Sequence, residues 1–393
     1  MRALTGRIQP YAWGSRTAIA AIQGRAVPSA TPEAELWLGA HPAAPSTVDG
    51  ESLADVIAAD PAATLGPARR FGRLPFLLKL LAADAPLSLQ AHPDAEQARA
   101  GFAAEQAAGV PADAAHRNYK DPYHKPEMIV ALTDFDALCG FRSPGESAAV
   151  LDSFGLPALA PVVSALRGSA AADGLRTAVT SLLGLPDAEA TVSAAVKVAT
   201  GSATADPAYA LAAELGARYP GDPGVLVALL LNQVRLRPGQ ALYAPAGVLH
   251  AYLAGVGVEL MAASDNVLRG GLTPKHVDVP ELLRVLRFEP AAPPVADPEP
   301  VAPGVEAWPA LLPGVDEFAL RRARVGGPYG EVDLTGTGPR VLFCLSGRIV
   351  ADDGTGALSL GPGESAFVDA SRESVRLTGY GELYQAGTAE TVT

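Results

Sequence analysis

Cysteine is nearly absent from this sequence of 393 residues, which contains only Cys139 and Cys344. Each lies in an apolar, strand-like setting, so we expect buried free thiols rather than a disulfide framework. Positive charge is also scarce: 30 Lys and Arg stand against 42 Asp and Glu, for a net charge of −12 and a pI near 5.0. This balance argues against a nucleic-acid partner, and an anionic substrate would need a local basic pocket.

Long apolar runs are missing as well. Every apolar run is too short or too interrupted to span a bilayer, and the amino terminus lacks the charged-then-apolar pattern of a secretory signal. An excess of Ala, Gly and Pro raises the mean hydropathy without implying a membrane partner. We therefore expect a soluble, cytoplasmic protein, long enough for two or three domains.

The stretch from Leu87 to Asp94 carries the first group of candidate site residues. It follows an apolar run, 76–81, and a turn at 84–86, and apolar residues alternate in it with Ser88, Gln90 and His92. This is the period of a half-buried strand, so the three polar side chains share one face.

Two further polar clusters, 119–127 and 247–250, each lead into an expected strand, 128–132 and 251–253. Together with the first stretch they offer only nitrogen and oxygen donors, on Gln90, His92, Glu127 and His250. Such donors suit a borderline divalent ion such as Zn²⁺ in an open, catalytic site. A Gln carbonyl is an unusual zinc ligand, and each residue taken singly also fits a hydrogen-bonded polar group at a strand end.

The amino-terminal part predicts strands and turns around two aromatic segments, 9–15 and 35–42. Trp13, Trp37 and His41 could line a pocket, although core packing also explains the tryptophans. Helices are expected at 53–59, with Ser52 as N-cap, and at 94–109, with Asp94 as N-cap.

The sequence pattern changes from strand-like to helical at Ser143. A capping box from Ser143 to Glu146 begins a run of Ala-, Leu- and Val-rich helices. We interpret 143–232 as a helical domain inserted into a β framework. A strand-like pattern returns at 239–250. The spacing G-x5-P-x-G-x2-H in this segment, ending at His250, resembles the second metal motif of cupin barrels.

The carboxyl-terminal part begins with a helix capped by Asp278 and a Pro- and Ala-rich crossing segment, 289–308. Short strands and Gly turns then predict a second jelly-roll barrel. No histidine follows His276, so we expect this barrel to lack a His-based metal site. The predicted fold is mainly β with inserted α: a catalytic cupin barrel (1–142 and 233–288), the helical domain (143–232), and a crossing segment with a metal-free cupin-like barrel (289–393).

Several longer motifs occur in one order along residues 10–276, and together they resemble class I mannose-6-phosphate isomerases of the cupin superfamily. These motifs are Tyr11-Ala12-Trp13-Gly14, Glu35-Leu36-Trp37-Leu38-Gly39-Ala40-His41-Pro42, Leu87-Ser88-Leu89-Gln90-Ala91-His92-Pro93, His124-Lys125-Pro126-Glu127, and Ala263-Ser264-Asp265-Asn266-Val267-Leu268-Arg269-Gly270-Gly271-Leu272-Thr273-Pro274-Lys275.

The resemblance implies a zinc-dependent aldose–ketose isomerase of carbohydrate metabolism, on the route to GDP-mannose, that interconverts mannose 6-phosphate and fructose 6-phosphate. It also implies one Zn²⁺ per chain, held by Gln90, His92, Glu127 and His250. We expect a monomer whose only partner is the sugar phosphate.

Roles for the remaining candidates follow from enediolate chemistry. Lys125, near the metal, is the candidate proton shuttle, or only hydrogen-bonds a substrate oxygen. Arg269 could steady the enediolate or the phosphate, with Gly270 and Gly271 permitting close backbone approach. Further candidates, in chain order, are Trp13 for the substrate, Ser88 for the phosphate, His124 and Asp265 for ring opening, Glu259 for orienting a ligand or the sugar, and Lys275 for the phosphate.

Other functions stay open from the residues alone. An iron-dependent cupin dioxygenase would use a ligand set richer in His. A metal-dependent cupin could act on another sugar phosphate, and a non-catalytic sensor would bind one without turnover. A nucleotidyl-transferring fusion is set aside, because no Gly-rich nucleotide loop precedes a strand–helix pattern.

Overall fold

Strand β12 (His250–Ala262) is the centre of the first of two eleven-stranded antiparallel sheets in this computed structural model, which describes residues 1–202 and 206–389. Its first half pairs with β7 and β9, and its second half pairs with β6 and β8, with a register shift between Tyr252 and Ala254. The other strands of this sheet are β2 (Arg7–Gln9), β3 (Glu35–Leu38), β6 (Phe76–Ala83), β7 (Gln90–Ala91), β8 (Glu127–Ala131), β9 (Phe135–Phe141), β10 (Leu231–Leu236), β11 (Ala241–Ala244), β13 (Leu268–Arg269) and β14 (Val295–Ala296).

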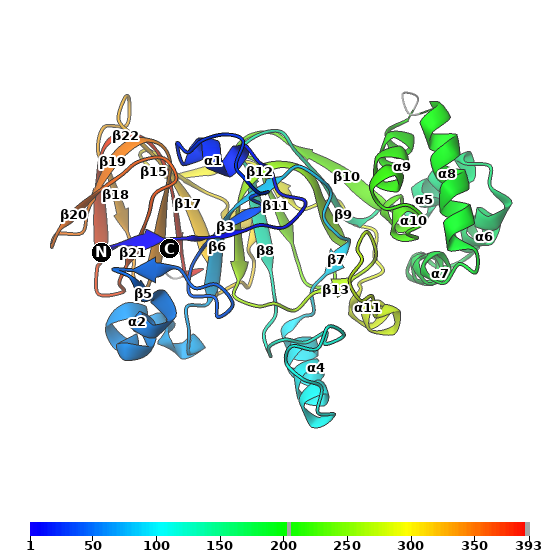
Figure 1. The fold of residues 1–393 in the computed structure, drawn as a ribbon, viewed down its shortest axis with the longest axis horizontal. Helices are drawn as coiled ribbons and strands as arrows, with labels where there is room; N and C mark the ends of the chain where they lie inside the picture. The colour runs from blue at the N-terminus through cyan, green and yellow to red at the C-terminus, as the bar shows by residue number, and fades with distance from the viewer. Residues whose placement is uncertain (203–205, 390–393) are drawn as a thin grey trace.

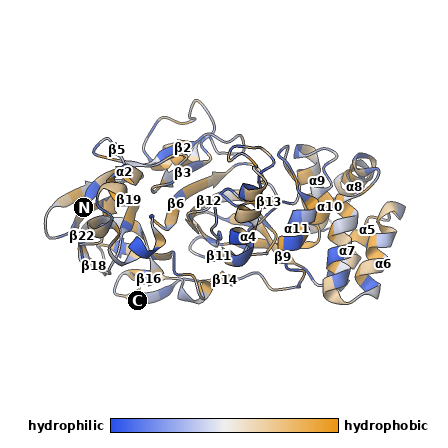
Figure 2. Cartoon of the chain, turned by 90° about the horizontal axis from the view of Figure 1, so that it is seen from below, coloured by the Kyte–Doolittle hydropathy of each residue, from blue (hydrophilic) through white to orange (hydrophobic). Residues whose placement is uncertain are grey.

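A helical region interrupts this sheet between two strands that pair with each other, β9 and β10. The predicted capping box of Ser143 and Glu146 opens its first helix, as expected. Figure 1 shows this region at one end of the long axis, and Figure 2 shows that its helices carry both hydrophilic and hydrophobic residues. The helices are α5 (Pro144–Ser153), α6 (Ala160–Gly168), α7 (Ala171–Leu183), α8 (Ala188–Ser202), α9 (Pro207–Arg218) and α10 (Gly224–Ala228).

The second sheet occupies the opposite end of the molecule, where both termini lie (Figure 1). Its members come from both ends of the chain, because β1 pairs with β21 on one side and with β4 on the other. The strands are β1 (Arg2–Thr5), β4 (Thr47–Val48), β5 (Glu51–Ser52), β15 (Glu299–Ala302), β16 (Val305–Ala307), β17 (Ala319–Val325), β18 (Val332–Thr335), β19 (Arg340–Asp352), β20 (Ala357–Leu360), β21 (Ser365–Val368) and β22 (Ser374–Gly387).

Further helices lie outside the inserted region. As predicted, Ser52 caps α2 (Leu53–Ala59), Asp94 forms a capping box with Gln97 at the start of α4 (Ala95–Ala107), and Asp278 caps α11 (Val279–Val285). Pro61 does follow the end of α2, but it also begins a new helix, because proline is well tolerated at the first helical position. The remaining helices are α1 (Ala18–Ile22), α3 (Pro61–Leu65) and three 3₁₀ turns (Gly66–Phe71, Pro157–Leu159 and Pro309–Leu311).

Apolar side chains of both sheets meet in one buried cluster. Leu78, Leu80 and Val258 contribute from the first sheet, and Phe343 and Phe367 contribute from the second. Each sheet also encloses a cluster of its own, so the charged residues described below lie inside otherwise apolar barrels. Truncating either phenylalanine to alanine would cost about 3–5 kcal/mol of stability.

The predicted fold class is confirmed: the chain is mainly β, with two antiparallel sheets and an inserted set of helices. Both cysteines are buried and free, as expected. Among the helices that the structure describes, none has the length and apolar character needed to cross a membrane.

Candidate metal centre and active site

Three strands of the first sheet bring two histidines and a glutamate together. Glu127 and His250 are the first residues of β8 and β12, and His92 directly follows β7. The Nε2 atom of His250 lies 2.9 Å from Glu127 Oε1, and that of His92 lies 3.3 Å from Glu127 Oε2. One donor atom from each side chain falls within 4.8 Å of the other two, which is close enough for a single ion.

Backbone carbonyls fix the orientation of both imidazoles. His92 Nδ1 is 2.8 Å from the carbonyl oxygen of Asn266, and His250 Nδ1 is 3.0 Å from that of Val248. When each Nδ1 carries the proton and donates it to its carbonyl, each Nε2 presents a lone pair to the centre. This arrangement is typical of metal-ligating histidines.

Gln90 lies beside this group, because it pairs with His250 across β7 and β12 and with Arg269 across β7 and β13. It is half-buried and lines the adjoining cavity. The four side chains offer nitrogen and oxygen atoms without sulfur, and the donor set fits Zn²⁺ in an open site.

Burial or neighbouring charges lower the pKa values of two of the donor side chains, which leaves both free to bind a cation. Burial, reinforced by the nearby Lys125 ammonium, lowers the pKa of His92 to about 4, so the ring is neutral at physiological pH. Burial acts to raise the pKa of Glu127, but Lys125 and the two histidines hold it well below its usual range. Lys125 Nζ contacts the Glu127 carboxylate and lies 3.3 Å from His92 Nε2.

A cavity of about 740 Å³ opens beside these donors. The predicted site residues that line it are Trp13, Ser88, Gln90, Lys125, Asp265, Arg269 and Lys275, and Trp37 and His41 also contribute. These residues come from segments separated by more than 200 positions in the sequence. The structure therefore brings together most of the candidates that the motifs suggested.

Arg269 and Lys275 are two of the cations that line the cavity, and no described residue accepts a hydrogen bond from the buried Nε of Arg269. Burial, together with the charge of Arg269, lowers the pKa of Lys275. The backbone reaches this position through Gly271, at φ 119°, where a Cβ atom would lie 2.6 Å from the Cα atom of Gly224. The expectation that a glycine permits close backbone approach here is confirmed.

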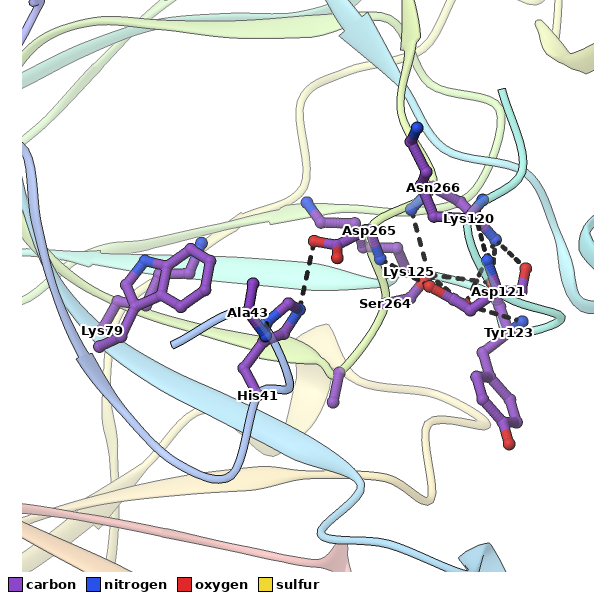
Figure 3. A network of polar contacts seen from close by, with 12 residues as sticks. His41, Ala43, Lys79, Lys120, Asp121, Tyr123, Lys125, Ser264, Asp265 and Asn266 are labelled. Carbon is purple, nitrogen blue, oxygen red and sulfur yellow. Dashed lines mark hydrogen bonds and ion pairs between the residues drawn. The ribbon is translucent and has the colours of Figure 1, made fainter. Parts of the chain in front are cut away.

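A polar network connects the loop before Glu127 with the segment that carries Asp265 and Arg269 (Figure 3). The Asn266 side chain donates to the carbonyl oxygens of Asp121 (2.7 Å) and Tyr123 (2.8 Å), and it accepts from the Lys120 N–H. Ser264 donates to the Asp121 carboxylate, at 2.8 Å. Since the Asn266 carbonyl also orients His92, this network links the metal group to the cavity wall.

Asp265 pairs with His41 rather than with His124. The Asp265 carboxylate lies 3.2 Å from His41 Nε2 (Figure 3), while His124 Nε2 lies 2.7 Å from Glu317, just before β17. Burial acts to raise the pKa of Asp265, but the hydrogen bond to His41 holds it below its ordinary value. His124 is not among the residues that line the cavity.

Glu259 lies behind the cavity, where its carboxylate is 2.8 Å from Lys79 Nζ. Lys79 is also 3.3 Å from Glu35, and both Lys79 and Glu35 line the cavity, although the sequence reasoning named neither as a candidate. Burial acts to lower the pKa of Lys79, but the two carboxylates hold it above its ordinary value. A single lysine within the otherwise apolar run 76–83 was the signal that could have identified it.

The predicted strand over 87–92 is wrong in extent, because only Gln90–Ala91 pairs as a strand. The predicted alternation nevertheless holds: Leu87, Leu89 and Ala91 are buried, while Ser88 and Gln90 line the cavity.

Comparisons with known proteins give a consistent result. The sequence model described as "Phosphomannose isomerase type I, catalytic domain" matches residues 1–144. The mannose-6-phosphate isomerase of Escherichia coli (strain K12) is 41% identical over 392 residues, covering 98% of each chain. That of Bos taurus is 32% identical, covering 94% of this chain and 93% of its own.

Solved structures agree along the whole chain. The mannose 6-phosphate isomerase of Salmonella typhimurium bound to fructose 6-phosphate and zinc is 38% identical and matches with a TM-score of 0.88, covering 99% of both chains. A zinc-bound holo form of a mannose 6-phosphate isomerase matches equally well, with a TM-score of 0.88, 38% identity, and coverage of 98% of this chain and 99% of its own.

Proposed function

The chain belongs to the type I family of mannose-6-phosphate isomerases, and from that premise we propose how its side chains divide the work of interconverting mannose 6-phosphate and fructose 6-phosphate. The enzyme is an aldose–ketose isomerase that uses zinc. When bound by His92, Glu127, His250 and Gln90, the ion supplies Lewis-acid polarisation of the sugar oxygens.

The observation that carries this assignment is the position of the His92, Glu127 and His250 group beside a cavity that Arg269 and Lys275 also line. A phosphorylated open-chain sugar has reactive oxygens at C1 and C2 and a dianion at C6. The donor group and the lining cations therefore suit both parts of this substrate.

Lys125 is assigned the proton transfer. Isomerisation removes the proton from C2 of the aldose, forms an enediolate, and returns a proton to C1. Lys125 lines the cavity and contacts Glu127, so its Nζ lies beside the donors that would hold the reacting oxygens. In its neutral amine form this side chain can accept the proton from C2, and the ammonium so formed can return it to C1.

Arg269 is assigned to the negative charge that develops on the enediolate. Its Nε has no partner among the residues described, so the guanidinium can donate to an incoming oxyanion without breaking an existing bond. Lys275 and Ser88 line the same cavity and are assigned to the phosphate, as a point charge and a hydroxyl donor.

Ring opening is assigned to Asp265 with His41. The depressed pKa of Asp265 keeps its carboxylate ionised, so it can accept the hydroxyl proton of the cyclic sugar. His41, 3.2 Å away, orients that carboxylate. We assign His124 instead to fixing the loop that carries Lys125, because its imidazole is held by Glu317.

Trp13 and Lys79 are assigned to the sugar hydroxyls, because both line the cavity. Glu259 acts through Lys79, which it holds in place. A buried lysine between two carboxylates presents a fixed donor to the cavity without carrying a net positive charge into it.

For the division of labour along the chain we keep the boundaries given above, with 1–142 and 233–288 for the chemistry, 143–232 for the inserted helices and 289–393 for the second barrel. The sheets depart from these boundaries at β1, β4 and β5, which belong to the second sheet, and at β14, which belongs to the first. We keep a monomer as the proposed active unit. We also keep the cytoplasm as the proposed compartment, since the substrate is a phosphorylated sugar.

A coupled assay on mannose 6-phosphate, with and without a chelator, tests the function. We expect turnover that the chelator abolishes and Zn²⁺ restores. Full activity in a verified metal-free sample would refute the zinc assignment. Oxygen consumption would indicate a dioxygenase, and sugar-phosphate binding without turnover would indicate a sensor.

A further inference from the structure

Three buried polar residues of the second barrel lie on one inward face. Arg321 on β17 pairs with Gln385 on β22, and Gln385 pairs with Leu342 on β19. Residues that face each other across antiparallel strands project to the same side, and Arg340 lies two residues before Leu342 on that side. Since Leu342 belongs to the core of this barrel, Arg321, Arg340 and Gln385 point inward with it. We call these three residues the arginine cluster.

The cluster is buried. Arg340 is 0% exposed, Gln385 is 1% exposed and Arg321 is 9% exposed. Backbone carbonyls hold the guanidinium groups: Arg321 donates to Thr335 at 2.7 Å, and Arg340 donates to Leu334 and to Arg372.

Several polar atoms of the cluster nevertheless lack partners. Within residues 1–202 and 206–389, no hydrogen bond reaches the Nε atoms of Arg321 and Arg340 or either amide atom of Gln385. An unsatisfied buried polar group costs about 1–3 kcal/mol, and more when it is charged. Four such atoms at one end of one barrel are therefore an expensive feature unless something binds them.

The charge of the cluster is also unbalanced. Burial, reinforced by the nearby charge of Arg321, lowers the pKa of Arg340 to about 10, and burial lowers that of Arg321. Among the described residues, Asp353 is the carboxylate whose charge acts on Arg340. It already accepts from the Met1 ammonium and lies 3.5 Å from Arg372. Two buried cations remain without a carboxylate of their own in the part of the chain that is described.

The neighbouring positions on the same face have little or no side chain. Ala319, two residues before Arg321, pairs with Gly387, two residues after Gln385. We propose that this end of the second barrel binds a small oxyanion of the phosphate type, held by Arg321, Arg340 and Gln385. A planar guanidinium matches the oxygens of such an anion, and the Gln385 amide supplies a further donor. The anion would be free phosphate or the phosphoryl group of a sugar phosphate.

Thermal unfolding with inorganic phosphate tests the proposal, using sodium chloride to match the ionic strength. We expect phosphate to raise the Tm of the full-length zinc enzyme by several degrees, because a ligand that binds only the folded state stabilises it. Arg321→Met should lose the part of this increase that the arginine cluster supplies, while phosphate bound at Lys275 and Ser88 still contributes, and it should keep its kcat. In phosphate-free buffer this variant should be at least as stable as the unaltered enzyme, because one of two mutually repelling buried cations is gone.

Two further variants complete the design. Gln385→Leu removes the amide without changing charge and should reduce the phosphate response, which provides a test if Arg321→Met folds poorly. Arg324→Met alters an arginine on the same strand that is 41% exposed and paired with Glu306, so its response to phosphate should match that of the unaltered enzyme. An equal Tm increase in all four proteins would place the phosphate elsewhere, and no increase in any of them would mean that water satisfies the cluster. Either result would overturn the proposal.

A second set of unfolding measurements, with fructose 6-phosphate, distinguishes a sugar phosphate from free phosphate as the ligand. A Tm increase that depends on Arg321 with this sugar phosphate identifies its phosphoryl group as the ligand. An increase that depends on Arg321 only with inorganic phosphate identifies the free ion.

Discussion

The two barrels share an architecture but differ in how charge is arranged inside them. In the first, Lys125 contacts Glu127, and Lys79 lies between Glu35 and Glu259, so each buried cation has a carboxylate partner. In the second, Arg321 and Arg340 are held by backbone carbonyls. The first barrel can gather a cation among its donors, while Arg321 and Arg340 of the second have no carboxylate partner among the described residues and suit an anion.

This difference shows that the fold determines where side chains come together, while the residue types determine which chemistry is possible there. The strands of both barrels place polar residues inside at a strand end. His92, Glu127 and His250 make a metal centre in one barrel, while the other has no histidine available to make the equivalent. Five measurements would break or sharpen the contrast.

The largest effect is expected from removing a metal donor in the first barrel. His92→Ala or His250→Ala should lower zinc affinity by more than the about 10–100-fold typical of residues that only support a ligand. Gln90→Ala should be milder. Metal content per chain after dialysis measures this, with His116→Ala, an exposed histidine, as control. Equal loss of zinc in all three donor variants would show that Gln90 contributes as much to zinc binding as the two histidines.

Lys125→Ala should lower kcat by about 10²–10⁴-fold, because proton transfer by a positioned group contributes that much. Solvent hydrogen exchange into C2 of the substrate gives an independent measurement. The matched control is Lys120→Ala, an exposed lysine of the same loop whose ammonium bonds the carbonyls of Ala112 and Ala114. Exchange at the normal rate in the Lys125 variant would exclude it as the base.

In the second barrel, Asp353→Asn should lower the free energy of unfolding by about 3 kcal/mol, because it leaves the buried Met1 ammonium without its counter-charge. Burial acts to raise the pKa of Asp353, but the Met1 ammonium and Thr355 hold it well below its usual range. A carboxyl whose pKa is depressed by folding stabilises the protein above its unfolded pKa of about 3.9 and loses that contribution as the pH falls.

The unaltered enzyme should therefore lose more stability between pH 6 and pH 3 than the Asp353→Asn variant. Urea titrations at several pH values measure this, with the exposed neighbour in Asp352→Asn as control. Parallel pH profiles for the enzyme and the Asp353 variant would contradict the assignment. Because Asp353 belongs to the second barrel, kcat at neutral pH should not change.

Lys275→Ala should raise KM by about 10–100-fold with little change in kcat, since a charge-assisted bond is worth about 1.5–3 kcal/mol and the phosphate takes no part in the proton transfer. Steady-state kinetics decide this, with Lys197→Ala on α8 as an exposed control. A fall in kcat without a rise in KM would move Lys275 to the reacting end of the cavity.

The smallest effect concerns the contact between the barrels. His124 and Glu317 form an ion pair, at 2.7 Å, between the loop that carries Lys125 and the segment before β17. A double-mutant cycle of His124→Ala and Glu317→Ala should give a coupling of about 0.5–3 kcal/mol in kcat/KM. Additive effects would show that the second barrel does not help to position this loop. An intact kcat in Glu317→Ala with a large loss in His124→Ala would return His124 to ring opening.

Much of the site could be predicted from the sequence because local motifs carry it. The alternation around Gln90, the capping residues Ser52, Asp94 and Ser143, and the order of the motifs depend on neighbours within a few positions, which a single sequence displays. The confirmed helix starts and the alternating faces at 87–91 are of this kind.

The parts that could not be predicted depend on distant partners. Nothing near His124 in the sequence indicates Glu317, 193 positions away, and nothing near Asp265 indicates His41. The predicted strand over 87–92 is longer than the observed one. Periodicity indicates on which face each side chain lies, whereas the length of the strand depends on its hydrogen-bonded partners, β12 and β13. Lys79 was missed because it lies within an apolar strand and its carboxylate partners come from two other strands.

The pairing of β1 with β21 has a consequence for the timing of synthesis. The Ser365 hydroxyl donates to the carbonyl of Leu4 across 361 positions, so one of the first strands made must wait for one of the last. At about 5–20 residues per second, a ribosome needs roughly 20–70 s to deliver that partner. During this interval β1 can pair only with β4, which also pairs with β5, and the edge that later meets β21 is open to other strands. The nascent chain is therefore most exposed to mispairing near its beginning, until its end arrives.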